Sequence, residues 1–563
     1  MKQAIVSVAT HILRRGKASF LKKARNPQQY QTRFLLDLIK RHRDTEFGRT
    51  HGFDQISTIA EFQQRVPIRT YQDFEPFIVR MTEGEENVLI RERPIYFNIT
   101  SGSTGKRKFI PVTKSSRKCI KKAASVTTGF LADAALRKGL PLGTLLFPAS
   151  MNSVGSTKGG IDFAPVSTSD LKLSNIGYRA FLSSPIESHQ IPDLKSRHYV
   201  CLAFALCDPT LRVIADTFPV TTLRLCQFLA LHSESLVHDL ETRTLTDWLK
   251  ISPDQRQVLE GKLKARPARI ADLKKVLAEH GRLTPEYAWP SLSFVVTARG
   301  GTSDFYFERF PEYFGTTPIF GGVYSSAEAT FGTHRDFGTD GVLLALESGF
   351  FEFIPRSQWD LEQPQTVLPW ELEVGQQYRI LVTNYNGFYR YDVGDVIEVE
   401  GFEGQTPIFI FRHRYKGFIT SVGEKTTEHH VTQVMSQLQK KHQVALENFC
   451  VTLTDEIPPC YVVNIELPEG KAIADPMQFI DDYDRFLADF HNIYGLKRKD
   501  QVKPPILRIL QSGSFEQLQQ SLIQKGASEV QIKLPKISYD RHLFPESAVI
   551  EEYQSQQTLK MQL

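Results

Sequence analysis

Long apolar segments are absent from this 563-residue sequence, in which no apolar run approaches the roughly 18 residues that a membrane-spanning helix needs. We therefore expect no stable membrane insertion. Basic and aromatic residues are not interleaved in any tract, and the net charge is only +5. A charge this small on a chain of this length argues against a nucleic-acid partner. The apolar content of 41% and the charged content of 23% are instead typical of a soluble globular protein.

Cysteine is scarce, and the six cysteines are scattered without any Cys-x-x-Cys pair. This pattern argues against a disulfide framework and against a paired-cysteine zinc or redox site. Several cysteines lie in apolar surroundings, as Cys201 does, which favours buried free thiols and a reducing, cytoplasmic location. The histidines also lack zinc-site spacing, because the adjacent His429 and His430 cannot place both rings on one helix face.

The two common nucleotide-binding motifs are missing as well. A Walker-type loop has four residues between its glycines, whereas only two residues lie between Gly102 and Gly105 here. That loop also needs Ser or Thr after its lysine, and the residue after Lys106 is an arginine. The dinucleotide fingerprint requires three correctly spaced glycines at the start of a helix, and this stretch has no such pattern. Any nucleotide site must therefore use another type of loop.

One loop, residues 98–108, concentrates hydroxyl groups, glycines and cations between two short apolar runs. The runs at 94–99 and 109–112 are β-prone, so we predict that the loop joins two strands at the edge of a sheet. Its glycines allow backbone N–H groups to approach an anion, and its side chains supply further donors. The predicted phosphate-binding residues are Thr100, Ser101, Ser103, Thr104 and Lys106. The alternative is a solvated Ser/Gly hairpin with basic residues at its exit.

Three later stretches, taken together with this loop, resemble the motifs of adenylate-forming enzymes in the same order. That superfamily includes acyl-CoA synthetases, firefly luciferase and peptide-synthetase adenylation domains. Residues 324–328 are similar to its Tyr-x-x-x-Glu motif, and residues 389–395 are similar to its Tyr-Arg-x-x-Gly-Asp type motif. Residues 414–423 are similar to its hinge segment, which begins Arg-x-Lys. One match alone is weak evidence, whereas four matches in order are strong evidence.

The resemblance implies roles for residues of these motifs. A carboxylate beside a triphosphate is repelled unless a cation lies between them, so we predict that Glu328 positions Mg²⁺. The alternative is a glutamate that caps a following helix. Asp395 is predicted to accept hydrogen bonds from both ribose hydroxyls, and the alternative is a turn residue. The nucleotide is also expected to contact Tyr324 and Ser325, and Arg414 at the hinge is expected to contact the ribose or phosphate edge.

Four further stretches narrow the resemblance to one family. Residues 45–53, 66–71, 77–85 and 513–533 are similar to segments of the auxin-responsive acyl acid amido synthetases, which are best known from plants and have bacterial relatives. Matches extend from about residue 27 to about residue 537, and we expect a bacterial-type relative. These enzymes join a carboxylic acid to an amino acid through an acyl adenylate. Lys533 matches the lysine of the family's closing motif and is the predicted catalytic cation, with Lys536 as the alternative.

The predicted fold is α/β, with a large adenylate-forming N-terminal body over residues 1–411 and a small α+β C-terminal cap over residues 412–563. The body is expected to bind ATP and the acyl acid. In the cap, the sequence predicts helices at 427–438, 476–492 and 515–524 and strands at 447–454, 460–466 and 505–510. Residues 541–563 are polar and glutamine-rich, which predicts a loosely held tail.

The predicted reaction has two steps and requires ATP and Mg²⁺. A carboxylate attacks the α-phosphate of ATP and releases pyrophosphate, and the amine of an amino acid then attacks the acyl adenylate to give an amide and AMP. Because charge builds on the phosphate oxygens in the first step, the predicted catalytic residues are Lys533 and the metal-positioning Glu328. The alternative is an acyl-CoA synthetase, which forms a thioester from the same acyl adenylate.

Overall fold

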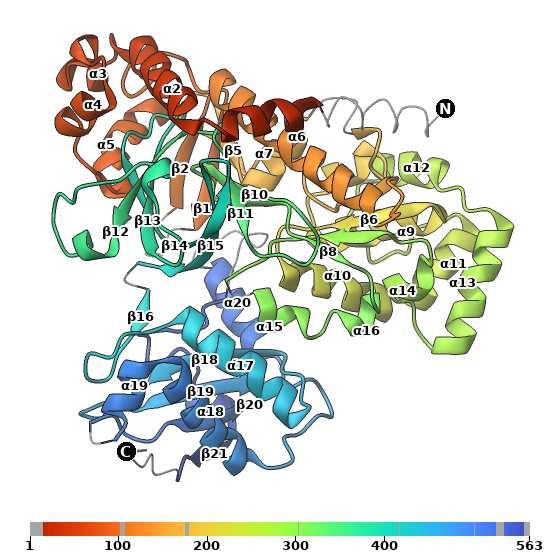
Figure 1. Ribbon diagram of the computed structural model, residues 1–563. Helices are drawn as coiled ribbons and strands as arrows, with labels where there is room; N and C mark the ends of the chain where they lie inside the picture. The colour runs from red at the N-terminus through yellow and green to blue at the C-terminus, as the bar shows by residue number, and fades with distance from the viewer. Residues whose placement is uncertain are drawn as a thin grey trace.

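The molecule has two lobes of unequal size (Figure 1). The structure is a computed structural model that describes residues 15–101, 107–174, 179–301, 303–415, 417–499, 501–524 and 534–556. The larger lobe contains three sheets and most of the helices, and the smaller lobe is built from the C-terminal part of the chain. No helix in these ranges is long and apolar enough to cross a membrane.

One sheet of the larger lobe has seven strands and is antiparallel throughout. Its strand order is β12-β13-β14-β15-β11-β10-β9. The strands are β9 (Val323–Ser325), β10 (Thr330–His334), β11 (Val342–Leu344), β12 (Phe350–Pro355), β13 (Gln377–Thr383), β14 (Tyr391–Glu403) and β15 (Thr406–Arg414). Continuous apolar runs such as that of β12 predict strands that are covered on both faces, and β12 is buried along almost its whole length.

Two four-stranded sheets complete the larger lobe. The first is parallel, in the order β3-β6-β7-β8, with strands β3 (Thr144–Leu146), β6 (Leu211–Ala215), β7 (Phe294–Val296) and β8 (Ile319–Phe320). The second has the order β2-β1-β5-β4, with strands β1 (Tyr96–Ser101), β2 (Arg107–Val112), β4 (Gly155–Ser156) and β5 (Asp162–Ala164). Since β1 and β2 form an antiparallel pair, the predicted strands on either side of the phosphate loop are confirmed.

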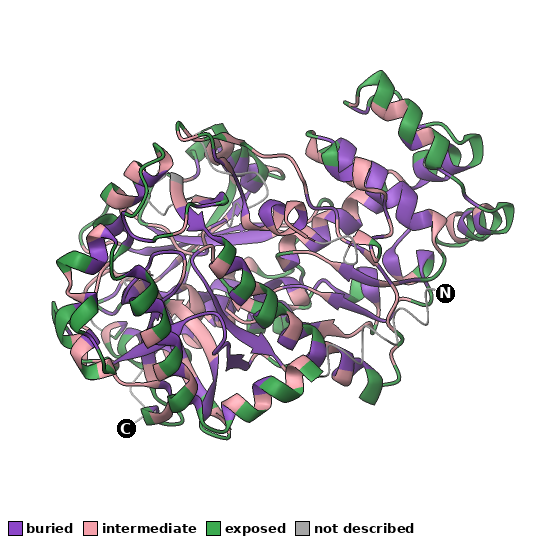
Figure 2. Ribbon diagram, turned by 90° about the horizontal axis from the view of Figure 1, so that it is seen from above, coloured by how far each residue is buried: buried purple, intermediate pink, exposed green. Residues whose placement is uncertain are grey.

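Helices lie around the three sheets, with most of their exposed residues turned outward (Figures 1 and 2). In chain order they are α2 (Pro27–His42), α3 (Glu46–Thr50), α4 (Ile59–Arg65), α5 (Tyr71–Thr82), α6 (Lys114–Arg137), α7 (Val166–Lys172), α9 (Leu194–Cys207), α10 (Pro219–Leu231), α11 (Ser233–Thr242), α12 (Pro253–Lys262), α13 (Pro267–His280), α14 (Pro285–Ala288), α15 (Ser303–Phe307) and α16 (Pro311–Phe314). Four short 3-10 turns are η1 (Phe53–Gln55), η2 (Ile186–Gln190), η3 (Arg356–Gln358) and η4 (Pro369–Glu371). Proline starts several helices because its missing N–H falls where a helix has no internal acceptor.

The long helix α6 separates a solvent face from a buried face. Thr113 caps its start by accepting a hydrogen bond from Ser116 N at 2.9 Å. The exposed face carries the lysines Lys114, Lys118, Lys121 and Lys122. Arg117 lies among these lysines in sequence but is buried, because the helical period turns it toward the interior. The buried face of α6, which carries Arg117, lines a cavity.

The smaller lobe is an α+β unit. Its sheet has the order β18-β19-β20-β21, with strands β18 (Asn448–Leu453), β19 (Tyr461–Glu466), β20 (Ile506–Leu510) and β21 (Val549–Gln554). Its helices are α17 (Glu428–His442), α18 (Pro476–Phe490), α19 (Asn492–Lys497) and α20 (Ser514–Gln524), with the 3-10 turn η5 (Glu546–Ala548), and the short strands β16 (Phe418–Ile419) and β17 (Thr426–Thr427) precede them. All six elements predicted here from sequence are confirmed.

The prediction of a loosely held C-terminal tail is wrong for β21. This strand pairs antiparallel with β20, from Ile506 opposite Gln554 to Leu510 opposite Val549. It lies at the edge of the sheet, and most of its side chains are exposed. An edge strand of this kind needs few apolar residues, so its polar composition resembles that of a tail. Residues 557–563 lie outside the described ranges.

Arg390, in the predicted motif 389–395, is a structural residue. Its guanidinium is buried and pairs with the Glu352 carboxylate at 3.0 Å. The same guanidinium donates to the backbone oxygens of Gln63 at 2.8 Å and Val66 at 2.9 Å. These contacts fix the end of α4 to strand β12, so Arg390 holds the N-terminal helices on the seven-stranded sheet.

We expect Glu352→Gln to destabilise the protein by roughly 3–5 kcal/mol, because it leaves the Arg390 charge buried without its counter-charge. The control is Glu403→Gln, since Glu403 is 44% exposed and pairs with Arg335 at 3.4 Å. An exposed pair of this kind contributes about 0–1 kcal/mol. Thermal midpoints of the two variants measure the difference. Equal midpoints would contradict the role given to the buried pair.

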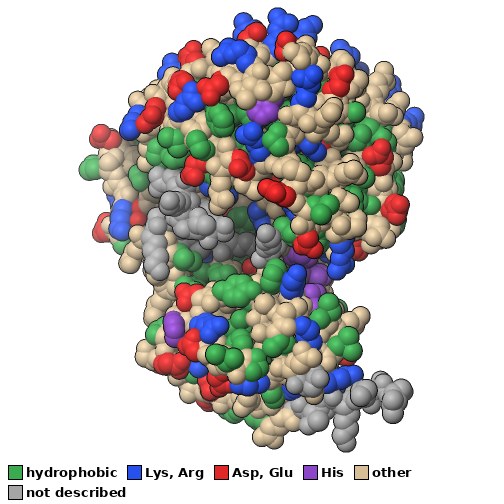
Figure 3. Space-filling view, turned by 90° about the vertical axis from the view of Figure 1, so that its left-hand side faces the viewer, with side chains coloured by type: hydrophobic (Ala, Val, Ile, Leu, Met, Phe, Trp, Pro, Cys, Tyr) green, Lys and Arg blue, Asp and Glu red, His purple; other side chains and the backbone are tan. Residues whose placement is uncertain are grey.

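The two lobes contact each other around α15. Arg309 of the larger lobe pairs with Glu447 of the smaller lobe at 2.6 Å, and Glu308 pairs with Lys440 at 3.0 Å. Figure 3 shows the molecule narrowed between the two lobes when it is seen from the left-hand side of Figure 1. The described contacts at α15 therefore include two ion pairs between the lobes.

Lys536 also takes part in the contact between the two lobes. Only 1% of the residue is exposed, and its ammonium donates a hydrogen bond to Asn448 Oδ1 at 2.6 Å. The ammonium also lies 4.3–4.6 Å from the centres of three aromatic rings, those of Phe305, Tyr306 and Phe449. Two of these rings belong to α15 and one to β18, so this lysine binds across the lobe boundary by cation–π attraction.

Candidate active site

The β1–β2 hairpin carries the predicted phosphate loop. Ser101 lies opposite Arg107 in the register, so the two ends of segment 102–106 are held beside each other. Thr100, which is partly buried, lies opposite Lys108. The remaining loop predictions lie outside the described residues, namely Ser103, Thr104, Lys106 and the side chain of Ser101. Phosphate binding by this loop stays a prediction.

Lys108, at the base of the hairpin, is a candidate site residue that the sequence analysis did not single out. Its ammonium lies 4.9 Å from the centre of the Tyr71 ring. Burial lowers the pKa of Lys108, and the negative charge of Glu328 opposes this shift. The hairpin base and Glu328 are therefore electrostatic neighbours. The sequence signal was present, because Lys108 is the last of three cations in the loop.

Glu328 lies between β9 and β10, and no helix follows it, so the alternative of a helix cap is wrong. Its Oε2 accepts a hydrogen bond from Ser326 Oγ at 2.7 Å, and its Oε1 accepts one from Tyr391 OH at 3.0 Å. Burial and the Glu328 carboxylate raise the pKa of Tyr391, which keeps this phenol protonated as a donor. The backbone oxygen of Glu328 accepts from Asn384 and Asn386. The carboxylate is thus rigidly held.

This single carboxylate suits Mg²⁺ bound together with a nucleotide. Within the described residues, no three His, Cys, Asp or Glu side chains are grouped as a metal cage. Mg²⁺ in nucleotide sites is commonly held by one or two carboxylates, phosphate oxygens and water, and not by an all-protein cage. Glu328 lines a cavity and therefore fits this type of ligand set.

Asp395, Tyr324 and Arg414 form a second polar group. Tyr324 OH donates to Asp395 Oδ2, and Arg414 Nε lies 2.8 Å from Asp395 Oδ1. Asp395 and Arg414 are opposite each other on β14 and β15, which explains why two motifs nineteen positions apart meet. The Asp395 carboxylate raises the pKa of Arg414. The structure thus brings three predicted nucleotide-contacting residues together, and their contact with a nucleotide stays a prediction.

A cavity of about 120 Å³ lies beside Glu328. One part of the wall is the end of β9, with the predicted residue Ser325, and the segment between β9 and β10. Another part of the wall is formed by α6 and α7, where Ile120 and Val166 supply apolar surface. A cavity with both apolar surface and a few fixed polar groups is typical of a small-molecule site.

Two charged residues of this cavity were missed from sequence. Arg117 of α6 donates through Nη1 to Asp170 Oδ1 of α7. They are 53 positions apart, on two helices, and neither belongs to a recognisable motif. The helical period of α6 could have shown that Arg117 faces away from the lysines, but it could not have shown that Asp170 lies opposite.

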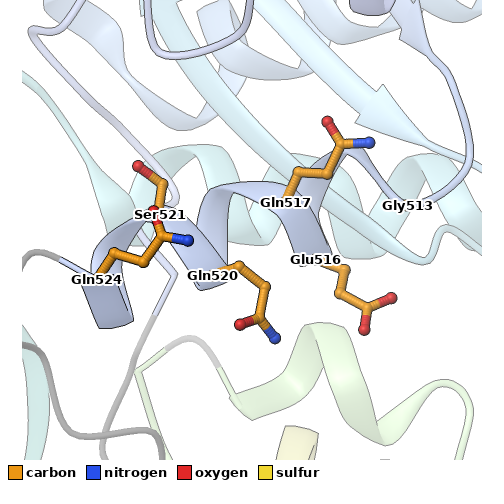
Figure 4. A pocket seen from close by; sticks show the side chains of 6 residues that line it. All are labelled: Gly513, Glu516, Gln517, Gln520, Ser521 and Gln524. Atoms are coloured by element: carbon orange, nitrogen blue, oxygen red, sulfur yellow. The ribbon is translucent and has the colours of Figure 1, made fainter.

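A second, wider hollow of about 400 Å³ runs along α20 (Figure 4). Its side chains are polar and come from one helix and the residue before it, namely Gly513, Glu516, Gln517, Gln520, Ser521 and Gln524. The family-like stretch 513–533 begins here, but Lys533 lies outside the described residues. Its predicted catalytic role stays a prediction.

The fold and the grouped motifs define an adenylate-forming enzyme. A hairpin with a hydroxyl-rich loop, a fixed carboxylate beside a cavity, and an Asp–Arg pair near the lobe junction all lie in the larger lobe. The smaller lobe contacts this body around α15.

The chain belongs to the GH3 family. The GH3 family N-terminal domain matches residues 16–319, the central domain residues 342–414 and the C-terminal domain residues 429–542. This result confirms the resemblance to acyl acid amido synthetases that the sequence motifs indicated.

Similar proteins include indole-3-acetic acid-amido synthetase GH3.5 of Arabidopsis thaliana, which is 27% identical over 549 residues covering 91% of this chain and 89% of the relative. Probable indole-3-acetic acid-amido synthetase GH3.2 of Oryza sativa subsp. japonica is 27% identical over 545 residues, covering 90% and 87%. A solved structure, AtGH3.15 acyl acid amido synthetase in complex with 2,4-DB, matches with a TM-score of 0.85 and 22% identity over 97% of this chain and 98% of that chain. The structural likeness confirms the predicted adenylate-forming α/β fold.

We expect Asp395→Asn to raise the KM for ATP by about 10- to 100-fold. A hydrogen bond to a charged group contributes about 1.5–3 kcal/mol, and each 1.4 kcal/mol changes affinity about tenfold. The KM for the carboxylic acid should change much less, because Asp395 is not among the residues that line the cavity described above. Initial rates of pyrophosphate exchange measured against each substrate separate the two effects. An equal rise in both KM values would contradict a ribose role.

Proposed function

We propose that this protein uses ATP to adenylate a carboxylic acid and then transfers the acyl group to the amine of an amino acid, with release of pyrophosphate and AMP. The observation that carries the proposal is the fixed Glu328 carboxylate on the wall of a cavity, where two motifs of adenylate-forming enzymes meet through its hydrogen bond with Tyr391. Membership of the GH3 family supports the same reaction, since relatives named above are amido synthetases.

In this proposal the nucleotide lies between the hairpin and the Asp395–Arg414 pair. Asp395 accepts from the ribose hydroxyls, and Arg414 contacts the ribose or phosphate edge. Tyr324 orients the Asp395 carboxylate through its hydroxyl. The phosphates are held by the hairpin residues Thr100, Ser101, Ser103, Thr104 and Lys106. Mg²⁺, held by Glu328 and the phosphates, would neutralise charge on the phosphate oxygens.

The acid would occupy the cavity with its carboxylate toward Glu328. The reacting carboxylate must meet the α-phosphate, so the wall formed by α6 and α7 is left for the rest of the acid. Attack by the substrate's own carboxylate makes a protein nucleophile unnecessary. Substrate positioning and charge stabilisation then supply the catalysis.

We assign the residues up to Arg414 to an adenylation body, because β15 (Thr406–Arg414) extends past the boundary predicted at residue 411, and the residues after it to a cap that delivers Lys533 to the phosphates. A junction that follows β15 could absorb a rotation of the cap between the two half-reactions. The partners are a small carboxylic acid and an amino acid. The six cysteines are all free thiols, which supports a cytoplasmic location.

The proposal is tested by acid-dependent exchange of labelled pyrophosphate into ATP, screened over aliphatic, benzoate-like and indole-like acids. An acid that supports exchange is then incubated with enzyme, ATP, Mg²⁺ and an amino-acid mixture. Mass spectrometry should detect an N-acyl amino acid. A lack of exchange with every acid would overturn the adenylation step.

An acyl-CoA synthetase is the competing function, because it forms the same acyl adenylate. Replacing the amino-acid mixture with coenzyme A should give little thioester. A dominant acyl-CoA product without any amide would overturn the amido synthetase proposal and leave the adenylation step in place.

A further inference from the structure

The Arg117–Asp170 pair is unusual as part of an acid-binding cavity. A wall that receives only hydrocarbon would be expected to be apolar, because burying a charge is unfavourable unless the charge is paired and hydrogen-bonded. Here the cavity carries a carboxylate and a guanidinium on facing helices. This pair has no part in holding the nucleotide motifs described above, so its place in the wall requires another explanation.

Both helices that carry the pair are firmly placed. The α7 residue Ser169, next to Asp170, donates from Oγ to Asn98 Oδ1 at 2.7 Å, and this bond ties α7 to strand β1. On α6, Thr127 Oγ1 accepts a hydrogen bond from Thr333 Oγ1 at 2.7 Å, and this bond ties α6 to strand β10. Asp170 is therefore positioned by its neighbours on a fixed helix and does not depend on its bond with Arg117 alone.

The pair is incomplete in the described structure. Arg117 has a side chain that is only 10% exposed, and its buried Nε has no hydrogen-bond partner among the described residues. Asp170 uses Oδ1 for Arg117, while its side chain remains 46% exposed. An ionised carboxylate offers further acceptor sites on both of its oxygens. A hydrogen-bond acceptor is thus available at the cavity wall.

We propose that Asp170 accepts a hydrogen bond from a hydroxyl or ammonium group on the acyl acid, so that the cavity selects acids bearing such a donor over the unsubstituted acids. This inference rests on the proposed acid-adenylating function and names its substrate class. An acid without a donor displaces the water that donates a hydrogen bond to Asp170 and makes no hydrogen bond in its place. The carboxylate is then left without a partner, which weakens the binding of that acid. Because Asp170 is half exposed, we expect a preference of about tenfold to a hundredfold in kcat/KM.

The test measures pyrophosphate exchange with matched acids, namely benzoate, the three hydroxybenzoates and the three aminobenzoates, together with straight-chain acids and their ω-hydroxy and ω-amino derivatives. The wild-type enzyme should favour at least one substituted acid over its parent by about tenfold or more in kcat/KM. Asp170→Leu should abolish this preference. A purely structural role for Asp170 would instead lower the rates with all acids in proportion.

Three further variants sharpen the test. In Asp170→Asn the amide oxygen can still accept a hydrogen bond from a hydroxyl group, but it has no charge to attract an ammonium group. A preference that is retained in this variant therefore identifies a hydroxyl group on the acid. A preference that is lost identifies an ammonium group. The double variant Arg117→Leu/Asp170→Leu removes both charges, which avoids an unpaired buried guanidinium if Asp170→Leu fails to fold. It should favour the unsubstituted acids. Asp162→Asn is the control, because Asp162 pairs with Lys172 of α7 at 2.7 Å and is not among the residues that line the cavity.

The outcomes separate this inference from the function on which it rests. Exchange with parent and substituted acids at equal kcat/KM would overturn the inference and leave adenylation established. A preference that survives in both Asp170→Leu and the double variant would also overturn it. No exchange with any acid would overturn the proposed function, and this inference with it.

Discussion

Glu328→Gln should lower the rate of acid-dependent pyrophosphate exchange by on the order of 10²–10³, by analogy with the removal of one preorganised group from an active site. The variant keeps the size of the side chain but removes the charge that is proposed to hold Mg²⁺. Its amide oxygen can still accept from Tyr391 or Ser326, so the fold should be retained. The exchange rate is measured across a range of Mg²⁺ concentrations, and the thermal midpoint is measured in parallel.

Glu403→Gln serves as the matched control for this experiment. The substitution is chemically identical, but the Glu403 side chain, at the end of β14, is 44% exposed and lies 3.4 Å from its partner Arg335. Its exchange rate should equal that of the parent. If Glu328→Gln also stays within a few-fold of the parent at every Mg²⁺ concentration, the metal role of Glu328 is wrong.

Lys533→Ala should also lower the adenylation rate by on the order of 10²–10³, if its charge stabilises the transition state on the α-phosphate. The comparison is Lys536→Met, which keeps the aliphatic stem among the aromatic rings of the lobe contact and removes the ammonium. This second variant should affect adenylation far less, because Lys536 is buried at α15 in the described structure. Single-turnover formation of the acyl adenylate measures both effects.

The reverse result would exchange the two assignments. If Lys536→Met stops adenylation while Lys533→Ala does not, Lys536 must leave its contact with α15 to reach the nucleotide. The thermal midpoint of Lys536→Met distinguishes this case from simple loss of folding, because a folded variant retains a cooperative transition.

Much of the fold could be predicted because its signals are local. The six elements of the smaller lobe follow from runs of about 5 to 15 residues with clear periodicity and turn residues between them. The β1–β2 hairpin was predictable for the same reason. Strand β21 was not, because its partner β20 is 48 positions away from it in sequence at the pair Ile506–Gln554 and its own residues are mostly exposed.

The site was predictable only where a motif is continuous in sequence. Glu328, Tyr324 and Asp395 were found because each lies in such a motif. The structure joins Tyr324 to Asp395 by a hydrogen bond, and it joins Glu328 to Tyr391 of the later motif in the same way. Arg117 and Asp170 were not found, because their relation arises from the packing of α6 against α7. No period or spacing within one segment encodes a contact between two helices.

The contact at α15 makes ionic strength a means of controlling the arrangement of the lobes. At 0.15 M salt the Debye length is about 8 Å and at 1 M it is about 3 Å, so exposed ion pairs weaken as salt rises. Lys440 is 66% exposed and its pair with Glu308 should be screened, whereas the Lys536 ammonium is enclosed by aromatic rings and should respond much less. Added salt would therefore loosen one side of the contact before the other. The two half-reactions, if they need different lobe arrangements, would then show different salt dependences in the same enzyme without any mutation.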